Sequence, residues 1–226
     1  MRSLLAIIGI TVVGSILMMV LLITARLFIE ARYLPTEAML PTFAVNDRLL
    51  IEKIKTYLRR PYVRGEVIVF YPPPGELNGQ DLSGDAMYVL GRLTGLPFLP
   101  DEPAMAKRVI GLPRDRIGIV HGQGVFVNGQ RLNEASYIKE APNYDLNVLA
   151  DIGGRNIDDT VIRPYGDMGD ARNPIVVPAD QLFVLGDNRN NSQDSHIFGM
   201  VKQDRVIGRV QVRFFPSFKI IELPMY

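Results

Sequence analysis

The sequence contains no cysteine and no tryptophan, and it has only two histidines, His121 and His196. The absence of cysteine excludes disulfides, thiolate metal sites and a cysteine nucleophile. Two histidines are too few for a multi-histidine metal cluster, and we expect neither a metal nor a cofactor. An excess of one charge sign is also missing, since 25 Lys and Arg against 24 Asp and Glu leave a net charge of +1. This balance gives no indication of a nucleic-acid partner.

Charged residues are absent from a long apolar run, Leu4 to Ala25. A helix of this length spans about 33 Å, close to the roughly 30 Å of a bilayer core. The run is longer than the about 7–15 apolar residues of a cleaved signal peptide, and no A-x-A site follows it. We therefore predict an uncleaved membrane anchor within residues 1–30. The flanking charges leave its orientation open, because Arg2 precedes the span while Arg26 and Arg32 follow it.

Residues 31–226 carry short alternating apolar runs separated by turn residues, a pattern typical of β-strands. We expect strands within four stretches: Asp47–Ile54, Gly65–Tyr71, Gln181–Asp187 and Gly208–Phe215. Hairpins are expected within Asp115–Leu132, because Gly122-Gln123-Gly124 and Asn128-Gly129 are turn signals. The pattern breaks near 72–103, which could hold a short helix, and near 143–174. The predicted fold class is mostly β: one transmembrane helix followed by an antiparallel β-sheet domain with two irregular insertions.

Two stretches contain residues that could carry chemistry. Lys107 opens the block "KRVIGLPRDRIGIV" and is either a surface lysine or a buried general base, and the pattern alone favours the surface. The turn "GDNRNNSQDSH", residues 186–196, follows an apolar strand. It is either a polar turn that satisfies its own backbone or a set of groups that orients a catalytic residue. His196 is a candidate triad base, but a structural role is favoured because no serine lies in a G-x-S-x-G elbow.

Four blocks, in this order behind the apolar run, resemble the type I signal peptidases, which are membrane-anchored serine proteases with a Ser/Lys dyad. The blocks are "PTEAMLPTFAVNDRLLIEK", "RGEVIVFYPP", "KRVIGLPRDRI" and "VLGDNRNNSQDSHIFGMV". They frame most of the chain between Tyr33 and Val201. The wording of the first block and the asparagine-rich fourth block are most similar to cyanobacterial or plastid-type members.

The resemblance implies a role for each matching position. Lys107 corresponds to the general base, Ser192 to the serine that orients it, and Thr36 to a hydroxyl of the oxyanion hole. A neutral lysine can take the proton of a nucleophilic hydroxyl, and preformed donors stabilise the oxyanion. Supporting roles fall on an ion pair, an acid behind the site and two loop-shaping residues: Arg108 with Asp187, Asp194, and Met39 with Pro41.

The sequence departs from the family pattern at three positions. His196 stands where many members have arginine, which we expect to matter little. Arg114 replaces a glycine, and this could alter the turn if that glycine needed a positive φ. Ala38 occupies the position of the nucleophilic serine, and its methyl group cannot attack a carbonyl. Retention of the base and its orienting serine favours a recent or deliberate loss, whereas Arg114 favours a natural inactive paralogue.

The resemblance implies an enzyme that removes signal peptides from exported preproteins after a small-x-small motif, here with binding but without cleavage. Its implied partners are signal peptides, the lipid bilayer and the secretion machinery. The implied location is the plasma membrane or the thylakoid membrane, with the peptidase domain on the extracytoplasmic or lumenal side. The alternative is a membrane-tethered β scaffold without catalysis. A site lysine at position 107 should be buried beside Ser192, whereas a scaffold lysine should be solvated.

Overall fold

The chain forms two compact units, of which one comprises Met1–Glu30 with Leu82–Glu102 and the other Ala31–Asp81 with Pro103–Tyr226. The structure is a computed structural model and describes four stretches of the chain: residues 2–73, 85–94, 103–146 and 173–226. Most of the two predicted insertions falls on residues 74–84, 95–102 and 147–172, outside the described residues.

The first unit contains a long apolar helix, α1 (Arg2–Phe28). Its segment Ile7–Phe28 has 22 residues and a mean hydropathy of 2.6, which is long and apolar enough to cross a membrane. Two threonines inside it donate their hydroxyl protons to carbonyls four residues earlier, at 2.9 Å for Thr11 and 2.8 Å for Thr24. Such bonds satisfy polar side chains within the helix itself. The predicted N-terminal helix is therefore present.

A short helix, α3 (Ala86–Thr94), lies in the first of the two stretches that break the strand pattern. Asp85 precedes it, and its Oδ1 accepts the backbone N–H of Met87 at 2.8 Å. A carboxylate at this position satisfies one of the N–H groups that a helix start leaves open. The helix belongs to the same unit as α1.

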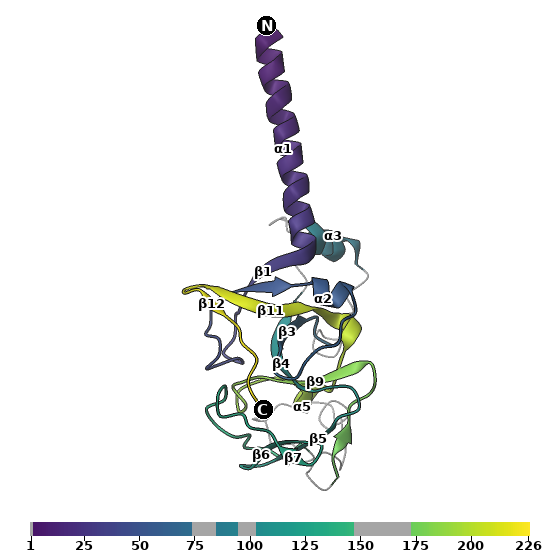
Figure 1. The fold of residues 1–226 in the computed structure, drawn as a ribbon, viewed down its shortest axis with the longest axis vertical. Helices are drawn as coiled ribbons and strands as arrows, with labels where there is room; N and C mark the ends of the chain where they lie inside the picture. Colours follow the sequence, from purple (N-terminus) through teal and green to yellow (C-terminus); the bar gives the residue numbers. More distant parts are fainter. Residues whose placement is uncertain (1, 74–84, 95–102, 147–172) are drawn as a thin grey trace. The chain divides into compact units, whose positions relative to one another are not determined.

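The second unit is built on an antiparallel sheet in which β11 runs between β2 and β3 (Figure 1). The strand order is β1-β2-β11-β3-β4-β9-β10, with β12 added beside β11. The bounds are β1 (Ile29–Tyr33), β2 (Arg48–Glu52), β3 (Val67–Phe70), β4 (Met105–Gly111), β9 (Gln181–Leu185), β10 (Val201–Lys202), β11 (Val206–Phe215) and β12 (Lys219–Ile220). The mostly β, antiparallel fold class is thus confirmed.

The centre of this sheet is buried on both faces. Every residue of β3 is buried, and its side chains alternate between two apolar clusters. Val67 and Val69 pack with Met39 in one cluster, whereas Ile68 and Phe70 belong to the other. This alternation follows from the two-residue period of a strand. Strand β4, which pairs with β3, therefore presents successive side chains to two different environments.

A smaller sheet has the order β7-β6-β5-β8. Its strands are β5 (Arg116–Val120), β6 (Gly124–Val127), β7 (Gln130–Arg131) and β8 (Ile175–Val176). Both expected hairpin turns are present, with positive φ at Gly122 and Gly124 in one and at Asn128 and Gly129 in the other.

Arg114, in the turn that joins β4 to β5, has φ +72°. This left-handed conformation is costly for a residue with a Cβ and is routine for glycine. The side chain of Arg114 is exposed, and its backbone N–H donates to the carbonyl of Val177 at 2.8 Å. The departure noted in the sequence therefore falls at a position where the backbone does require positive φ.

Candidate active site

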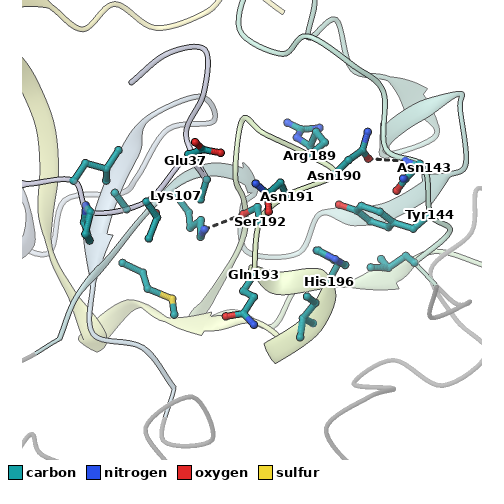
Figure 2. A pocket seen from close by; sticks show the side chains of 18 of the residues that line it. Glu37, Lys107, Asn143, Tyr144, Arg189, Asn190, Asn191, Ser192, Gln193 and His196 are labelled. Atoms are coloured by element: carbon teal, nitrogen blue, oxygen red, sulfur yellow. Dashed lines mark hydrogen bonds between the residues drawn. The ribbon is translucent and has the colours of Figure 1, made fainter. Parts of the chain in front are cut away.

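Four segments that lie far apart in the sequence line one cavity of about 540 Å³. They are the loop of residues 34–38, the start of β4 with the residue before it, residues 143–146, and residues 189–197 after β9. Four residues with predicted catalytic roles line it: Thr36, Ala38, Lys107 and Ser192. Figure 2 shows the Lys107 side chain directed at Ser192.

Lys107 is buried in β4, with 4% of its surface exposed. Its Nζ donates a hydrogen bond to Ser192 Oγ at 2.8 Å. Lysine is rarely buried to this degree without a specific partner. The side chain is thus shielded from water and oriented by a hydroxyl, which is the arrangement that a lysine general base needs.

Gly186 allows the turn after β9 to pack tightly against this pair. A Cβ at this position would lie 2.2 Å from Ser192 Oγ and 2.5 Å from the carbonyl oxygen of Ala38. The next residues bind the same loop, because Asn188 donates its backbone N–H to the Ala38 carbonyl and its side-chain amide to the Glu37 carbonyl, both at 3.1 Å. The backbone of residue 38 is therefore held in place although its side chain is only a methyl group.

The loop around residue 38 is held in place by a neighbouring residue that packs in the core. Met39 is fully buried in the core cluster that includes Phe43, and the backbone N–H of Phe43 donates to the Met39 carbonyl at 2.9 Å. Pro41 is exposed and follows a cis peptide bond. Thr36 is exposed at the cavity. The structure thus places Thr36 at the solvent side of the cavity and Met39 in the core.

Arg108, the next residue of β4, forms a bidentate ion pair with Asp187. Its Nε lies 2.7 Å from Oδ1 and its Nη2 lies 2.5 Å from Oδ2. The side chains are 2% and 0% exposed. Burial alone would lower the pKa of Arg108, but the hydrogen bonds and the charge of Asp187 outweigh it and raise that pKa. Arg108 Nη1 also donates to the Gly65 carbonyl at 2.7 Å, so the pair ties β4 to neighbouring loops.

Sequence reasoning did not assign a role to two further contacts of this cluster. Thr42 donates its hydroxyl proton to Asp187 Oδ2 at 2.5 Å. Arg189, which is fully enclosed, donates through Nη1 to Glu134 Oε2 at 2.7 Å, and Tyr137 donates to the other oxygen of Glu134 at 2.8 Å. Thr42 is part of the first block and Arg189 of the fourth, so membership of a block was the only available signal. Glu134 lies in neither.

Asp194 is completely buried behind Ser192. Its carboxylate accepts the backbone N–H of Gly186 at 2.9 Å and lies 2.5 Å from His196 Nδ1. Burial alone would raise the pKa of Asp194. The charge and hydrogen bond of His196, followed by the charge of Lys107 and the Gly186 N–H, outweigh it and lower that pKa. Asp194 is therefore an anion that is stabilised from two sides.

Among the described residues, no group of three or more His, Cys, Asp or Glu side chains could hold a metal ion. The chemistry that the described geometry supports uses a lysine, hydroxyl groups and backbone donors. The described geometry brings these groups together beside residue 38, which lines the same cavity.

A family model described as "Signal peptidase, peptidase S26" matches residues 6–215. Signal peptidase I from Leptolyngbya laminosa is 38% identical over 216 residues, which are 95% of this chain and 82% of that protein. Probable signal peptidase I-2 from Synechocystis sp. is 40% identical over 198 residues, which are 87% of this chain and 68% of that protein. Among solved structures, a signal peptidase I from Enterococcus faecalis V583 has 24% identity and a TM-score of 0.38, and covers 66% of this chain and 97% of its own.

The family model covers nearly the whole chain, and both relatives match it over more than two thirds of their own length. Both relatives come from cyanobacteria, in agreement with the wording of the first and fourth blocks. The resemblance seen in the sequence is confirmed. This chain belongs to the signal peptidase family, peptidase S26.

Proposed function

We propose that this chain holds the signal peptides of exported preproteins in the cavity beside β4, and that Ala38 prevents it from cutting them. The observation that carries the proposal is the buried Lys107–Ser192 pair, 2.8 Å apart, in the same cavity as Ala38. Family membership supports signal-peptide removal by a membrane serine protease as the activity of this fold.

The course of the peptide is suggested by the sheet register. Strand β9 pairs with β4 from Arg108 onward, so the preceding residues of β4 lie beside the cavity. An extended peptide can align there as an added strand. The apolar lining includes Leu34, Ala104 and Ala106, which suits small side chains and supports a small-x-small motif before the scissile bond.

The chemistry is defined for a serine at position 38. Its hydroxyl would attack the scissile carbonyl, and its proton would pass to the neutral amine of Lys107. The backbone N–H of residue 38 and the Thr36 hydroxyl would stabilise the oxyanion. Lys107 would then protonate the leaving amine and later activate the water that hydrolyses the acyl-enzyme. Ser192 would keep the lysine oriented throughout.

Ala38 lacks the hydroxyl that would make the first bond, so none of the later steps can follow, although the lysine, its orienting serine and the oxyanion donors are retained. Loss of a catalytic serine lowers turnover by roughly 10⁶ in a comparable protease, while substrate binding persists. Arg114 favours the second candidate, a natural inactive paralogue or membrane-tethered β scaffold that binds preproteins or a partner. In both cases the proposed location is the plasma membrane or the thylakoid membrane, anchored by α1, with the β-rich unit on the extracytoplasmic or lumenal side. The secretion machinery is a proposed partner.

Ala38→Ser tests the proposal. In the full chain in lipid nanodiscs, we expect cleavage of a preprotein with an A-x-A site to rise by up to roughly 10⁶ over the unchanged chain. The matched control is Ala38→Ser combined with Lys107→Met, which should cleave about 10²–10⁴ more slowly than Ala38→Ser alone. Binding of a labelled signal peptide to the unchanged chain is measured in parallel.

The two candidates differ in the result. Peptide binding together with restored cleavage supports the inactivated peptidase. Binding without restored cleavage, in a folded Ala38→Ser chain, favours the scaffold. Absence of both would show that the assignment of the cavity is wrong.

A further inference from the structure

The two ends of the cavity are lined by different kinds of side chain. One end, the apolar end, is formed by the loop before residue 38 and the start of β4: Leu34, Pro35, Ala104, Met105 and Ala106. The other, the polar end, is formed by polar side chains of residues 143–145 and 190–193 and by His196. Figure 2 shows Tyr144 and His196 on one side of Ser192 and Lys107 on the other. The Lys107–Ser192 pair therefore stands between the two ends.

The walls of the polar end are fastened to each other by Asn190. Its Oδ1 accepts the backbone N–H of Asn143 at 2.8 Å, and its Nδ2 lies 3.2 Å from both Glu140 Oε2 and the Ala141 carbonyl. The next residues of this wall, Tyr144 and Leu146, pack in the core cluster of the smaller sheet. The polar end is thus held in shape by the fold itself.

Tyr144 brings a buried hydroxyl to this end of the cavity. The residue is 7% exposed, and its ring stacks on His196 with centroids 4.1 Å apart and an interplanar angle of 16°. Its hydroxyl has no hydrogen-bond partner among the residues that the structure describes. Burial raises the pKa of this phenol well above its ordinary value, so the hydroxyl keeps its proton. Because buried polar groups normally have a partner, the hydroxyl is available to a bound molecule.

The charges around the cavity favour a neutral group as that partner. Carboxylates line it at Glu37 and Asp145, and basic side chains line it at Lys107 and Arg189. Neither sign is in excess, so a charged group would meet repulsion as well as attraction. A peptide amide is neutral and can both accept a hydrogen bond from a hydroxyl and donate one to it.

The position of the polar end indicates which part of a preprotein reaches it. If small side chains before the scissile bond occupy the apolar end, the scissile bond lies beside residue 38 and Lys107. The chain that follows this bond then continues into the polar end. An extended chain advances about 3.3 Å per residue, so only the first few residues after the bond lie there.

We propose that the polar end is a subsite for the first residues of the mature protein, where the Tyr144 hydroxyl forms a hydrogen bond with an amide group of the peptide. The inference rests on the proposed function in that the signal peptide occupies the apolar end. The amide belongs either to the peptide backbone or to an asparagine or glutamine side chain, and the chemistry is the same in both cases. Tyr144 is then a residue that determines specificity after the scissile bond.

The test measures the affinity of labelled peptides for the full chain with Ala38 in place, in lipid nanodiscs. Three peptides share one signal sequence that ends in A-x-A. The first continues with glutamine and further residues, the second has methionine in place of that glutamine, and the third stops at the final alanine as an amide. Tyr144→Phe keeps the ring and removes only the hydroxyl. Tyr57→Phe, at an exposed tyrosine outside the cavity, is the matched control.

We expect Tyr144→Phe to weaken binding of the glutamine peptide by about 2–10-fold, the effect of one hydrogen bond. Binding of the third peptide should not change, and Tyr57→Phe should change none of the three. An equal loss for the glutamine and methionine peptides assigns the bond to a backbone amide, whereas a loss for the glutamine peptide alone assigns it to the side chain. The unfolding temperature of Tyr144→Phe should be unchanged or higher, because the variant removes a buried group that has no partner in the free protein.

Unchanged affinity of all three peptides in a folded Tyr144→Phe chain would overturn the inference. So would an equal loss for the third peptide, since the hydroxyl would then act before the scissile bond. A lower unfolding temperature with unchanged affinity would show a purely structural contact and overturn it as well. If no peptide binds the unchanged chain, the proposed function fails and the inference falls with it, whereas binding that does not depend on Tyr144 refutes the inference alone.

Discussion

Lys107 and Arg108 are neighbouring basic residues of the same strand, but one lines a cavity and the other is enclosed in an ion pair. Lys107 faces the cavity and donates to the hydroxyl of Ser192. Arg108 points to the other face of β4, where both oxygens of Asp187 bind it. Successive side chains of a strand always separate in this way. Lys107 thus lines the cavity, whereas Arg108 is enclosed with Asp187 on the other face of the strand.

The comparison shows that the hydrogen-bond partner of a buried basic residue determines what that residue can do. A bidentate carboxylate keeps a guanidinium charged under all conditions and makes it a structural tie. The amine of Lys107 instead donates to the hydroxyl of Ser192 at 2.8 Å, in a cavity that residue 38 also lines. Exchange of the two residues would place a permanent guanidinium cation at the cavity beside Ser192.

The largest expected effect tests the cavity side of β4. In the Ala38→Ser chain, Lys107→Met should lower kcat by about 10²–10⁴, the range of a general base. The unfolding temperature should change little, because methionine fits the apolar part of the same space. Lys202→Met, at an exposed lysine of β10, is the matched control and should leave kcat unchanged. A Lys107→Met chain that cleaves normally would remove the distinction between the two cations.

Arg108→Met tests the buried ion pair with Asp187 on the other face of β4. It leaves the buried Asp187 carboxylate without its main partner, which should lower the free energy of unfolding by about 3–5 kcal/mol. Chemical denaturation in detergent micelles measures this loss, with Arg116→Met as the control at an exposed arginine of β5. The comparison fails if Arg108→Met lowers kcat in the Ala38→Ser chain while stability is unaffected, since Arg108 would then act in catalysis.

The pattern of short apolar runs predicted β2, β3, β9 and β11, but it did not include the seven-residue strand β4 (Met105–Gly111) among the expected strands. It missed β10 and β12, which have two residues each and carry no period. It also gave no means of telling that the strands divide between two sheets. Which strands share a sheet depends on packing between distant segments, and a local pattern does not contain it.

The candidate site was likewise predicted only in part. The resemblance predicted Lys107 and Ser192 as partners across 85 residues, and the structure brings them to hydrogen-bond distance. The pattern around Lys107 alone favoured an exposed side chain, and that reading was wrong. Glu134, which binds Arg189, was not foreseen because it lies outside the recognised blocks. Buried charges are predictable only when both partners are known, since neither residue is apolar in the sequence.

The smallest change in stability is expected at Arg114. This residue is a third basic residue of the same sequence block as Lys107 and Arg108. It is exposed, unlike Lys107 and Arg108, and its backbone has φ +72°. Arg114→Gly relieves a left-handed residue of about 1–2 kcal/mol, offset by the about 0.5–1 kcal/mol of extra chain entropy of glycine. We expect the free energy of unfolding to rise by about 0.5–1 kcal/mol in the same denaturation assay, with unchanged peptide binding. Arg116→Gly, two residues later in an ordinary strand, should have the opposite sign. A loss of stability in both variants would mean that the Arg114 side chain, and not its backbone, is what this turn requires.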